Sequence, residues 1–419
     1  MASGGRGVRI RRLGGDRAGE IRLTRFLRNP AVSLPEMVET ARERTAQRTC
    51  GRHVLAIQDT TVVRSEGGGG DYLHAMIGVD AETGALLGPI DASVLVRSSG
   101  ERAARVGKPI SEKESYRWLE GMEHAARVCA AADRITMIAD RESDIYEVFA
   151  CRPATVDLIV RVAHNRRTLD DGLCLFDAGP ADGAPVDIDL PAAPGRKART
   201  ARMSVRYYPV RIKRPQTKKS PVPAQTDDLY LVDIREKNPP EGITPIHWRL
   251  VTSHRVRRVE DALDIVALYR RRWLIEELFR TMKKKGFDIE GALVADEAPF
   301  HKLVMATLLA AITIQQLVHA RDGAAPAAPK DAPLRPALDA FDRDDLTLLA
   351  AFTKQLEGKT ARQKNPHPPD SLAYAAWVCA RLGGWTGYYG KPGPIVMLNG
   401  WIVFQNAKTG AAIAAQYNV

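Results

Sequence analysis

Five apolar runs rich in β-branched residues lie between residues 53 and 164, and they restrict the fold more than any other feature of the chain. The first is HVLAIQDTTVV, and LHAMIGVDAETGALLGPIDASVLV adds a hairpin because DAETG supplies turn residues between two such runs. RITMIA and VDLIVRVAH each follow a segment with helical periodicity. The order of three strands, helix, strand, helix and strand predicts an α/β fold with a mixed sheet and helices on its faces.

Two helix starts can be placed from their capping residues. SLPEMVETARERTAQR has Ser33 as an N-cap and Pro35 in the first turn. SEKESYRWLEGMEHAARVCAAA opens with Ser111 and Glu114 in the spacing of a capping box. We therefore expect one helix before the first strand and one between the third and fourth strands.

The composition changes near residue 167, and from there to about residue 255 the chain resembles a series of β-hairpins. We interpret residues 167–255 as a β-rich insertion. Within it, residues 196–219 contain ten Lys or Arg and no acid. This basic run is either a solvated loop or a set of hairpins that present cations to phosphates, which would add affinity and salt dependence without base specificity.

The charge of the whole chain indicates the kind of partner to consider first. Its 419 residues are enough for two or three domains, and the formal net charge is +11 with a pI of about 9.5. Hydrophobic residues make up 45% and charged residues 26%, which is ordinary for a globular protein. The basic balance favours polyanions as partners, nucleic acid ahead of a membrane surface.

Cysteine and apolar patterns indicate the compartment. The five cysteines have no CxxC spacing, so neither a zinc site nor a disulfide framework is predicted. The first twenty residues are too polar for a secretory signal. LVMATLLAAITIQQLV, residues 303–318, is too short and too interrupted by polar groups to span a bilayer, so we expect a buried helix there. A cytoplasmic protein with free thiols and no membrane partner is expected.

The segment YRRRWLIEELFRTMKKK, residues 269–285, places seven cations around two adjacent glutamates. We expect it to belong to one long helix over residues 256–285. At about 100° per residue, four of its residues would then share one narrow stripe: Tyr269, Arg272, Glu276 and Lys283. The stripe is either a solvated face with i,i+4 pairs or a carboxylate held among cations, as a site that handles phosphates and metal requires.

Three further acids stand at positions that allow a functional role. Asp59 lies in the middle of the first strand, where Asp is disfavoured, so it is at a frayed strand end or is paired, protonated or metal-bound. Asp140 directly follows the fourth strand, so it is a helix N-cap or part of a site at the carboxyl edge of the sheet. Asp144 is an accessory acid or a surface residue.

The predicted topology brings these acids together. In a sheet of this order the first and fourth strands are neighbours, which places Asp59 near Asp140, and Glu276 would join them from the later helix. Three hard oxygen ligands suit Mg²⁺ or Mn²⁺. Two such ions about 4 Å apart would activate a water or a 3′-hydroxyl and stabilise the leaving oxygen at a phosphodiester.

The chain resembles the cut-and-paste DDE transposases of the bacterial insertion-sequence-four family. That family's signature is Tyr, two residues, Arg, three residues, Glu, six residues and Lys, and the four residues of the predicted stripe match it in full. IQDTT and ADRESDIYE resemble the segments that carry the two catalytic aspartates of the family. The likeness also includes RFLRNPAVS, EKESYRWL and SLAYAAWVCARLGGW, and it covers most of the chain.

The resemblance implies a ribonuclease-H-like core with a β-rich insertion and a helical C-terminal domain. Asp59, Asp140 and Glu276 would be catalytic and would bind two Mg²⁺ (or Mn²⁺) ions. Excision would run through a hairpin on the transposon end and finish with strand transfer into target DNA.

The resemblance also implies how DNA is held. Arg272 and Lys283 would bind phosphates of the transposon end, and Tyr269 would hydrogen-bond to one. Trp248 occupies the place of a tryptophan that supports a flipped base, although it could instead be packed inside the insertion. Arg161 matches a core-strand arginine near the DNA, or it forms a structural salt bridge. The implied partners are transposon-end DNA, target DNA and a second copy of the chain in a synaptic complex, in a nucleoid-associated, cytoplasmic protein.

The start of the chain departs from the family pattern. Members usually begin with a helical end-recognition domain, whereas about 25 Gly- and Arg-rich residues precede RFLRNP here. We expect these residues to be a disordered or truncated region. Without end recognition, the chain could instead be a DNA-binding or dimerising inhibitor of related transposases. A ribonuclease-H-like nuclease or resolvase limited to hydrolysis is a further alternative.

These observations predict a division of the chain into six segments. They are the N-terminal region, residues 1–25; the two parts of the core, 26–166 and 256–322; the insertion, 167–255; a Pro- and Ala-rich linker, 323–336; and a helical C-terminal dimerisation domain, 337–419.

Overall fold

The computed structural model describes residues 8–66, 69–97, 109–169, 172–190, 198–216, 222–284, 286–323 and 333–417. By its internal contacts the chain divides into two units, and each is described by itself. Unit 1 comprises Met1–Thr49, Thr60–Ser99 and Leu274–Val419, and unit 2 comprises Cys50–Asp59 and Gly100–Trp273. Residues 324–332 of the predicted linker lie outside the described residues.

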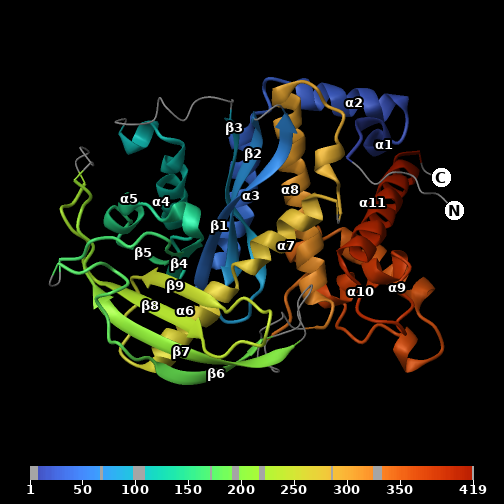
Figure 1. The fold of residues 1–419 in the computed structure, drawn as a ribbon. Coiled ribbons are helices and arrows are strands. Elements are labelled where there is room, and N and C mark those ends of the chain that lie inside the picture. The colour runs from blue at the N-terminus through green and yellow to red at the C-terminus, as the bar shows by residue number, and fades with distance from the viewer. Residues whose placement is uncertain are drawn as a thin grey trace. The chain divides into compact units, whose positions relative to one another are not determined.

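Nine strands pair in the order β3-β2-β1-β4-β5-β9-β8-β7-β6 (Figure 1). β4 runs parallel to both β1 and β5, whereas β9, β8, β7 and β6 are added in antiparallel fashion. The first five strands in this order are those of a ribonuclease-H-like sheet, and the predicted α/β fold class is confirmed. The strands are β1 (His53–Glu66), β2 (Gly69–Asp80), β3 (Leu86–Arg97), β4 (Arg134–Ala139), β5 (Val156–Arg161), β6 (Ala184–Leu190), β7 (Arg199–Val210), β8 (Leu229–Glu236) and β9 (His247–Thr252).

The parallel strands of unit 2 are buried on both faces. Residues 54–57 of β1 and 137–139 of β4 are fully buried, without alternation between apolar and polar side chains. Such continuous burial is typical of parallel strands that are covered on both sides. Helix α4 (Arg117–Val128) packs on β4 and β5, and the short α5 (Tyr146–Ala150) contacts α4. The buried β1–β4 pair therefore provides a rigid support for the residues that follow the paired segments.

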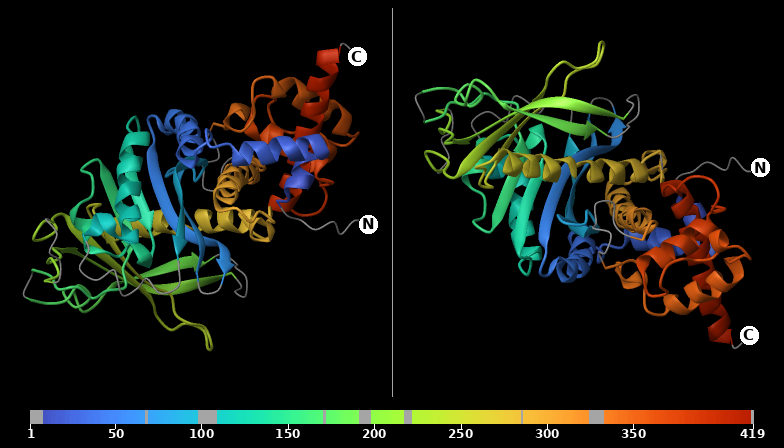
Figure 2. Two further views of the ribbon diagram at one scale, coloured as in Figure 1. Left: turned by 90° about the horizontal axis from the view of Figure 1, so that it is seen from above. Right: turned by 90° about the horizontal axis from the view of Figure 1, so that it is seen from below.

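The strands of the insertion segment have two different faces. On one face the pairing places Val205 of β7 beside Ile234 of β8 and Ile234 beside Trp248 of β9. Helix α6 (Val259–Arg270) contacts β7 and lies along these strands, as Figure 2 shows. The other face carries charged side chains. This alternation is the period-2 pattern of a half-covered antiparallel sheet.

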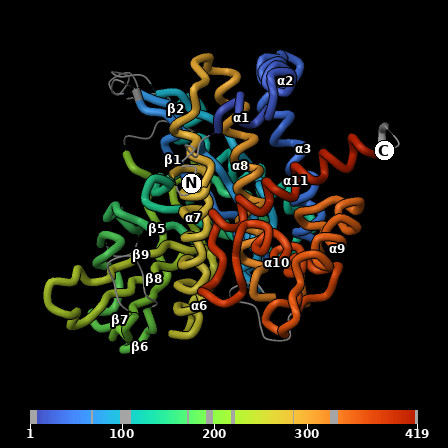
Figure 3. Tube along the Cα trace, turned by 90° about the vertical axis from the view of Figure 1, so that its right-hand side faces the viewer, coloured from blue at the N-terminus to red at the C-terminus, as the bar shows by residue number. Residues whose placement is uncertain are grey.

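Unit 1 is built around one long helix, α8 (Glu297–Ala320). It packs against β3, α2 (Arg17–Arg28) and α3 (Leu34–Thr49) and also against the C-terminal helices (Figure 3). The remaining helices are α1 (Ile10–Gly14), α7 (Trp273–Met282), α9 (Asp345–Leu356), α10 (Leu372–Leu382) and α11 (Pro394–Tyr417). A buried cluster joins the end of α8 to α9, α10 and α11, with Phe341 and Phe404 stacked edge to face at 5.3 Å.

Helix α8 confirms the buried helix predicted from residues 303–318, whereas the prediction that the stretch is too short and too polar to span a bilayer is wrong. By length and composition it could cross a membrane, and it is the one such helix among the described residues. Of its apolar window, 72% is buried inside the structure. Elements from both earlier and later parts of the chain thus cover its apolar side chains.

Two local predictions for the first third of the chain are wrong. Disorder was predicted for residues 1–25, but Ile10–Gly14 forms α1 and Arg17–Arg28 forms α2. The side chain of Asp16 caps α2 by accepting a hydrogen bond from the Gly19 amide at 2.6 Å. Ser111 and Glu114 do not cap a long helix, because residues 110–116 form two 3₁₀ turns and α4 begins at Arg117. In the first case a single well-placed cap outweighs composition.

Candidate functional site

The predicted helix over residues 256–285 is two helices. α6 ends at Arg270 and α7 begins at Trp273, with Arg271 and Arg272 in the turn between them. The single stripe expected from one continuous helix therefore does not exist. Tyr269 closes α6 and belongs with Arg272 to unit 2, whereas α7 carries Glu276 in unit 1.

The two predicted catalytic aspartates stand at matching positions of two neighbouring strands: Asp140 directly follows β4, whereas Asp59 lies within β1, which continues to Glu66. The parallel pairing of β1 with β4 runs from His53 opposite Arg134 to Ile57 opposite Ile138. Asp59 and Asp140 each lie two residues beyond that last pair, so the same edge of the sheet carries both. Adjacent strands are about 4.8 Å apart. The expectation that the first and fourth strands are neighbours is thus confirmed.

Asp59 is ion-paired rather than frayed. Its Oδ2 lies 2.8 Å from Nη1 of Arg272, and the two side chains are 15% and 16% exposed. The pair connects the middle of β1 to the turn after α6 within unit 2. An aspartate in a strand is disfavoured unless a partner compensates its burial, and Arg272 supplies that partner. The carboxylate stays within reach of solvent.

Asp140 caps the turn that follows β4. Its side chain accepts a hydrogen bond from the Glu142 amide at 2.9 Å, and its backbone is extended. The N-cap interpretation of Asp140 is therefore confirmed. A cap uses one carboxylate oxygen, so this role is compatible with a second contact at the other oxygen.

Tyr269 is the most connected of the predicted site residues. Its side chain is buried, and Arg161 donates a hydrogen bond to it. Burial raises the pKa of the Tyr269 hydroxyl, the cations Arg272 and Arg161 act in the opposite direction, and the charge of Asp140 raises it further. Tyr269 is thus a neutral hydroxyl surrounded by two arginines and an aspartate.

Trp248 and Arg161 complete this cluster. The rings of Trp248 and Tyr269 meet edge to face, with centroids 6.0 Å apart. Arg161, the last residue of β5, donates a hydrogen bond from Nη2 to the carbonyl oxygen of His247 at 3.3 Å. Trp248 is neither buried nor fully exposed, so it packs on α6 and also keeps an accessible surface. Because His247 takes part through its backbone, no side-chain signal could have identified it.

Glu276 and Lys283 lie in unit 1. Glu276 is in the first turn of α7 and is partly exposed. Lys283 follows the end of α7, and its Nζ lies 3.2 Å from Oε1 of Glu290. The structure therefore brings six of the eight predicted residues together in unit 2: Asp59, Asp140, Arg161, Trp248, Tyr269 and Arg272.

Asp144 has a role that the sequence analysis did not foresee. Its side chain is fully buried, and Oδ2 accepts hydrogen bonds from the Ala163 and His164 amides at 2.8 and 2.9 Å. His164 Nδ1 and Arg166 bind the same carboxylate. Both predicted alternatives, an accessory acid and a surface residue, are therefore wrong. Asp144 holds the chain that leaves β5.

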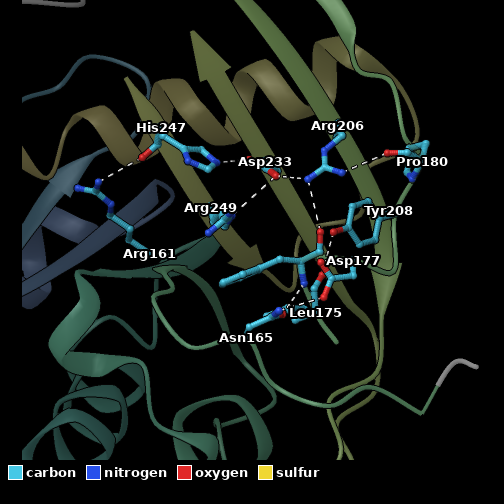
Figure 4. Close-up of polar contacts among 11 residues, drawn as sticks. Arg161, Asn165, Leu175, Asp177, Pro180, Arg206, Tyr208, Asp233, His247 and Arg249 are labelled. Atoms are coloured by element: carbon cyan, nitrogen blue, oxygen red, sulfur yellow. Dashed lines mark hydrogen bonds and ion pairs between the residues drawn. The ribbon is translucent and has the colours of Figure 1, made fainter. Parts of the chain in front are cut away.

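The charged face of the insertion strands uses part of the basic run internally. Asp233 of β8 is 3% exposed and is bound by Arg206 of β7 and by His247 and Arg249 of β9, as Figure 4 shows. Arg199 is likewise paired with the buried Glu236. At least two cations of residues 196–219 therefore hold strands together. A phosphate-binding role for the other cations stays a prediction.

The oxygen donors of Asp59 and Asp140 suit a hard divalent cation. The two carboxylates stand at matching positions of neighbouring parallel strands, and Asp59 already neutralises a cation, Arg272. Carboxylate oxygen is the donor that Mg²⁺ and Mn²⁺ prefer. Among the described residues no group of three or more His, Cys, Asp or Glu is gathered so as to hold a metal. Asp59 and Asp140 thus fit part of such a donor set.

A comparison with protein families agrees with this chemistry. Residues 123–313 match the family model described as a transposase DDE domain. The matched stretch runs from α4 to α8 and includes Asp140, Glu276 and Lys283. The match supports a DDE transposase family, whose members act on DNA, generally with divalent metals such as Mg²⁺, and it supports transposase activity in general.

Proposed function

We propose that this chain is a Mg²⁺- (or Mn²⁺-) dependent cut-and-paste DNA transposase of the insertion-sequence-four type. The observation that carries the proposal is the cluster in unit 2, where Asp59 and Asp140, at matching positions of the parallel strands β1 and β4, adjoin Arg272, Tyr269 and Arg161. Carboxylates at one sheet edge next to phosphate-binding cations suit phosphodiester chemistry. The match to a transposase DDE domain supports the same reaction class.

Asp59, Asp140 and Glu276 would hold two divalent ions. When bound, the ions supply activation of the attacking oxygen and stabilisation of the leaving oxygen. In the first reaction a water oxygen attacks phosphorus, the bond from phosphorus to the 3′ oxygen breaks, and that oxygen takes up a proton to become a 3′-hydroxyl. This 3′ oxygen then attacks a phosphorus of the opposite strand, the bond from that phosphorus to the 3′ oxygen of the flanking DNA breaks, and a hairpin forms as the flanking 3′ oxygen takes up a proton. Water attacks the hairpin phosphorus and displaces the transposon 3′ oxygen as a hydroxyl again. This hydroxyl attacks a phosphorus of target DNA and displaces a target 3′ oxygen, which takes up a proton.

Arg272 has two possible partners in this scheme. Its guanidinium is paired with Asp59, and it has the planar geometry that binds phosphate through two hydrogen bonds. A phosphate beside Asp59 and Asp140 would compete for Arg272, so that the Asp59 carboxylate could bind a cation in place of the guanidinium. Tyr269 and Arg161 would orient the same phosphate, and Trp248 would support an unstacked base.

The proposal includes the partners and location implied by this activity. The chain would bind transposon-end and target DNA and would act as a homodimer in a synaptic complex, with residues 337–419 pairing the subunits. It would work in the bacterial cytoplasm on the nucleoid. The basic charge of the chain favours such contacts with DNA.

The test is a cleavage and joining assay with the purified full chain, Mg²⁺ and labelled duplexes that carry the inverted repeats flanking the reading frame. Nicks, hairpins and joined products are expected. Glu276→Ala should abolish all three and spare binding, whereas Glu260→Ala, an exposed glutamate of α6, should leave them unchanged. Binding without cleavage would instead indicate an inhibitor of related transposases. Cleavage without joining would indicate a nuclease, and full activity of Glu276→Ala would refute the assignment of that residue.

A further inference from the structure

Unit 1 contains a pocket of about 710 Å³ that is separate from all eight predicted site residues. Residues of α7, the end of α8 and the start of α11 line it, and α8 packs directly against α11 (Figure 3). Pockets of about 300–1,000 Å³ typically accommodate small molecules. Its charged lining consists of three cations and two acids, so the expected ligand is polar; they are Arg280, Arg321, Lys391, Glu277 and Asp322.

The start of α11 favours an anion. This helix of 24 residues begins at Pro394, and Pro394, Ile395 and Val396 line the pocket together with Gly393. The first amide groups of a helix have no acceptor within the helix, and the helix dipole places partial positive charge there. No acid occurs in the first turn, residues 394–397, to neutralise that charge. Anions bind readily at such helix starts.

Two cations are held at the rim of the pocket. Arg321 Nη1 donates a hydrogen bond to the carbonyl oxygen of Pro392 at 2.7 Å, which fixes its guanidinium beside the start of α11. Lys391 Nζ lies 2.8 Å from Oδ2 of Asp322, and Arg321 Nε lies 3.6 Å from the same oxygen. Asp322 thus positions both cations and offsets part of their charge.

A buried histidine supplies a second, independent indication of a ligand. His319 lines the pocket and is only 8% exposed, and within the described residues its Nδ1 has no hydrogen-bond partner. Burial, followed by the charges of Arg335 and Arg321, lowers the pKa of His319 to about 4, so the ring is neutral near pH 7. Both charges that act on it are cationic, which indicates a positive local potential. A buried nitrogen without a partner costs stability, and a ligand oxygen would satisfy it.

We infer that this pocket binds a phosphate-type oxyanion between the start of α11 and the side chains of His319, Arg321 and Lys391. The oxyanion is either a free phosphate compound or a backbone phosphate of DNA. The site lies outside the cluster that carries the proposed reaction, so it is a second anion site rather than part of the first.

The test is isothermal titration calorimetry on the full chain with pyrophosphate and, separately, with a short DNA duplex of arbitrary sequence at fixed ionic strength. Pyrophosphate is expected to bind one to one. Lys391→Gln should weaken binding about tenfold, as loss of a charged hydrogen-bond donor does. Lys354→Gln, which removes the same charge from an exposed position on α9, should change it less than twofold. Asp322→Asn should tighten binding, because it removes the acid that competes with the ligand.

The possible results distinguish a free phosphate ligand from a DNA phosphate, and both from the absence of an anion site. Loss of pyrophosphate binding in Lys391→Gln and in a folded His319→Leu variant supports a free phosphate ligand. If pyrophosphate gives no heat but the duplex binds and is weakened by Lys391→Gln alone, the ligand is a DNA phosphate. Equal effects of Lys391→Gln and Lys354→Gln, or no binding of either probe, would overturn the inference. None of these outcomes depends on cleavage activity, so the inference can fail while the proposed function stands.

Discussion

Unit 2 contains two clusters in which an aspartate is bound by arginine, and the two aspartates have different roles. Within β1, Asp59 is paired with Arg272, and its side chain is 15% exposed. In the insertion strands Asp233 is bound by Arg206, His247 and Arg249, and its side chain is 4% exposed. A carboxylate that is almost fully enclosed is fixed by the fold, whereas a partly exposed one can accept a new partner from solution. Exposure, rather than residue type, separates the two clusters.

The largest effect expected from this comparison is on catalysis. Asp59→Asn should reduce DNA cleavage on the order of 10³-fold or more, as loss of one member of a catalytic group commonly does. Its thermal midpoint should stay close to that of the wild type. Asp264→Asn, an exposed aspartate of α6, is the matched control and should cleave normally. Rates are measured with labelled end duplexes, and an active Asp59→Asn would remove the catalytic role of this cluster.

The second cluster should respond in the opposite way. Asp233→Asn removes the counter-charge of Arg206 and Arg249, whose side chains are 23% and 33% exposed, and should lower the free energy of unfolding by about 1.5–3 kcal/mol. Asp177→Asn, an exposed aspartate nearby, should change it by less than about 0.5 kcal/mol. Urea denaturation followed by circular dichroism measures both. If the Asp233→Asn protein were stable but no longer cleaved DNA, Asp233 would have a catalytic role rather than a structural one.

A buried histidine beside β4 predicts that the protein loses stability in acid. His254 Nε2 shares a hydrogen bond of 2.9 Å with Thr136, and burial, followed by the charge of Arg134, lowers the pKa of His254 from 6.5 to about 4. Below pH 6.5 the unfolded chain binds a proton that the folded chain does not, so stability falls as the pH drops from 6.5 towards 4. The loss should reach about 3 kcal/mol, at about 1.4 kcal/mol per pKa unit.

Urea denaturation near pH 7 and near pH 4.5 measures this loss. His254→Gln should show a smaller difference between the two conditions than the wild type. His319 has a pKa lowered to about 4 as well, so part of the acid sensitivity should persist in that variant. An unchanged difference would show that His254 does not titrate in this range.

The smallest effect concerns the hydroxyl between the arginines. Tyr269→Phe keeps the ring contact with Trp248 and removes the hydrogen bond from Arg161. We expect DNA binding to weaken about two- to tenfold, since one hydrogen bond contributes about 0.5–1.5 kcal/mol. A fluorescence anisotropy titration measures the change. Tyr230→Phe, elsewhere on the insertion strands, is the matched control, and an equal loss there would point to a general effect on folding.

Much of this arrangement could be predicted from local pattern. The order of strands and helices along residues 53–164 follows from apolar runs and turn residues, and Asp140 stands out because it directly follows a strand. The break between α6 and α7 could not be predicted, since residues 270–272 are all arginine and none of them is a helix breaker. The role of Asp144 depends on His164 and Arg166, about twenty residues away. Sequence periodicity describes which residues share a face of one element. The α6–α7 break and the role of Asp144 depend on contacts between different elements, which periodicity does not describe.

The position of α8 in the chain has a consequence for biosynthesis. The helices that cover one side of it, α10 and α11, are translated after it, whereas β3, α2 and α3 precede it. For the time needed to add about another hundred residues, a helix apolar enough for a membrane leaves the ribosome with one flank uncovered. Nascent chains that stop before α10 are therefore the forms of this protein most prone to aggregate or to need a chaperone.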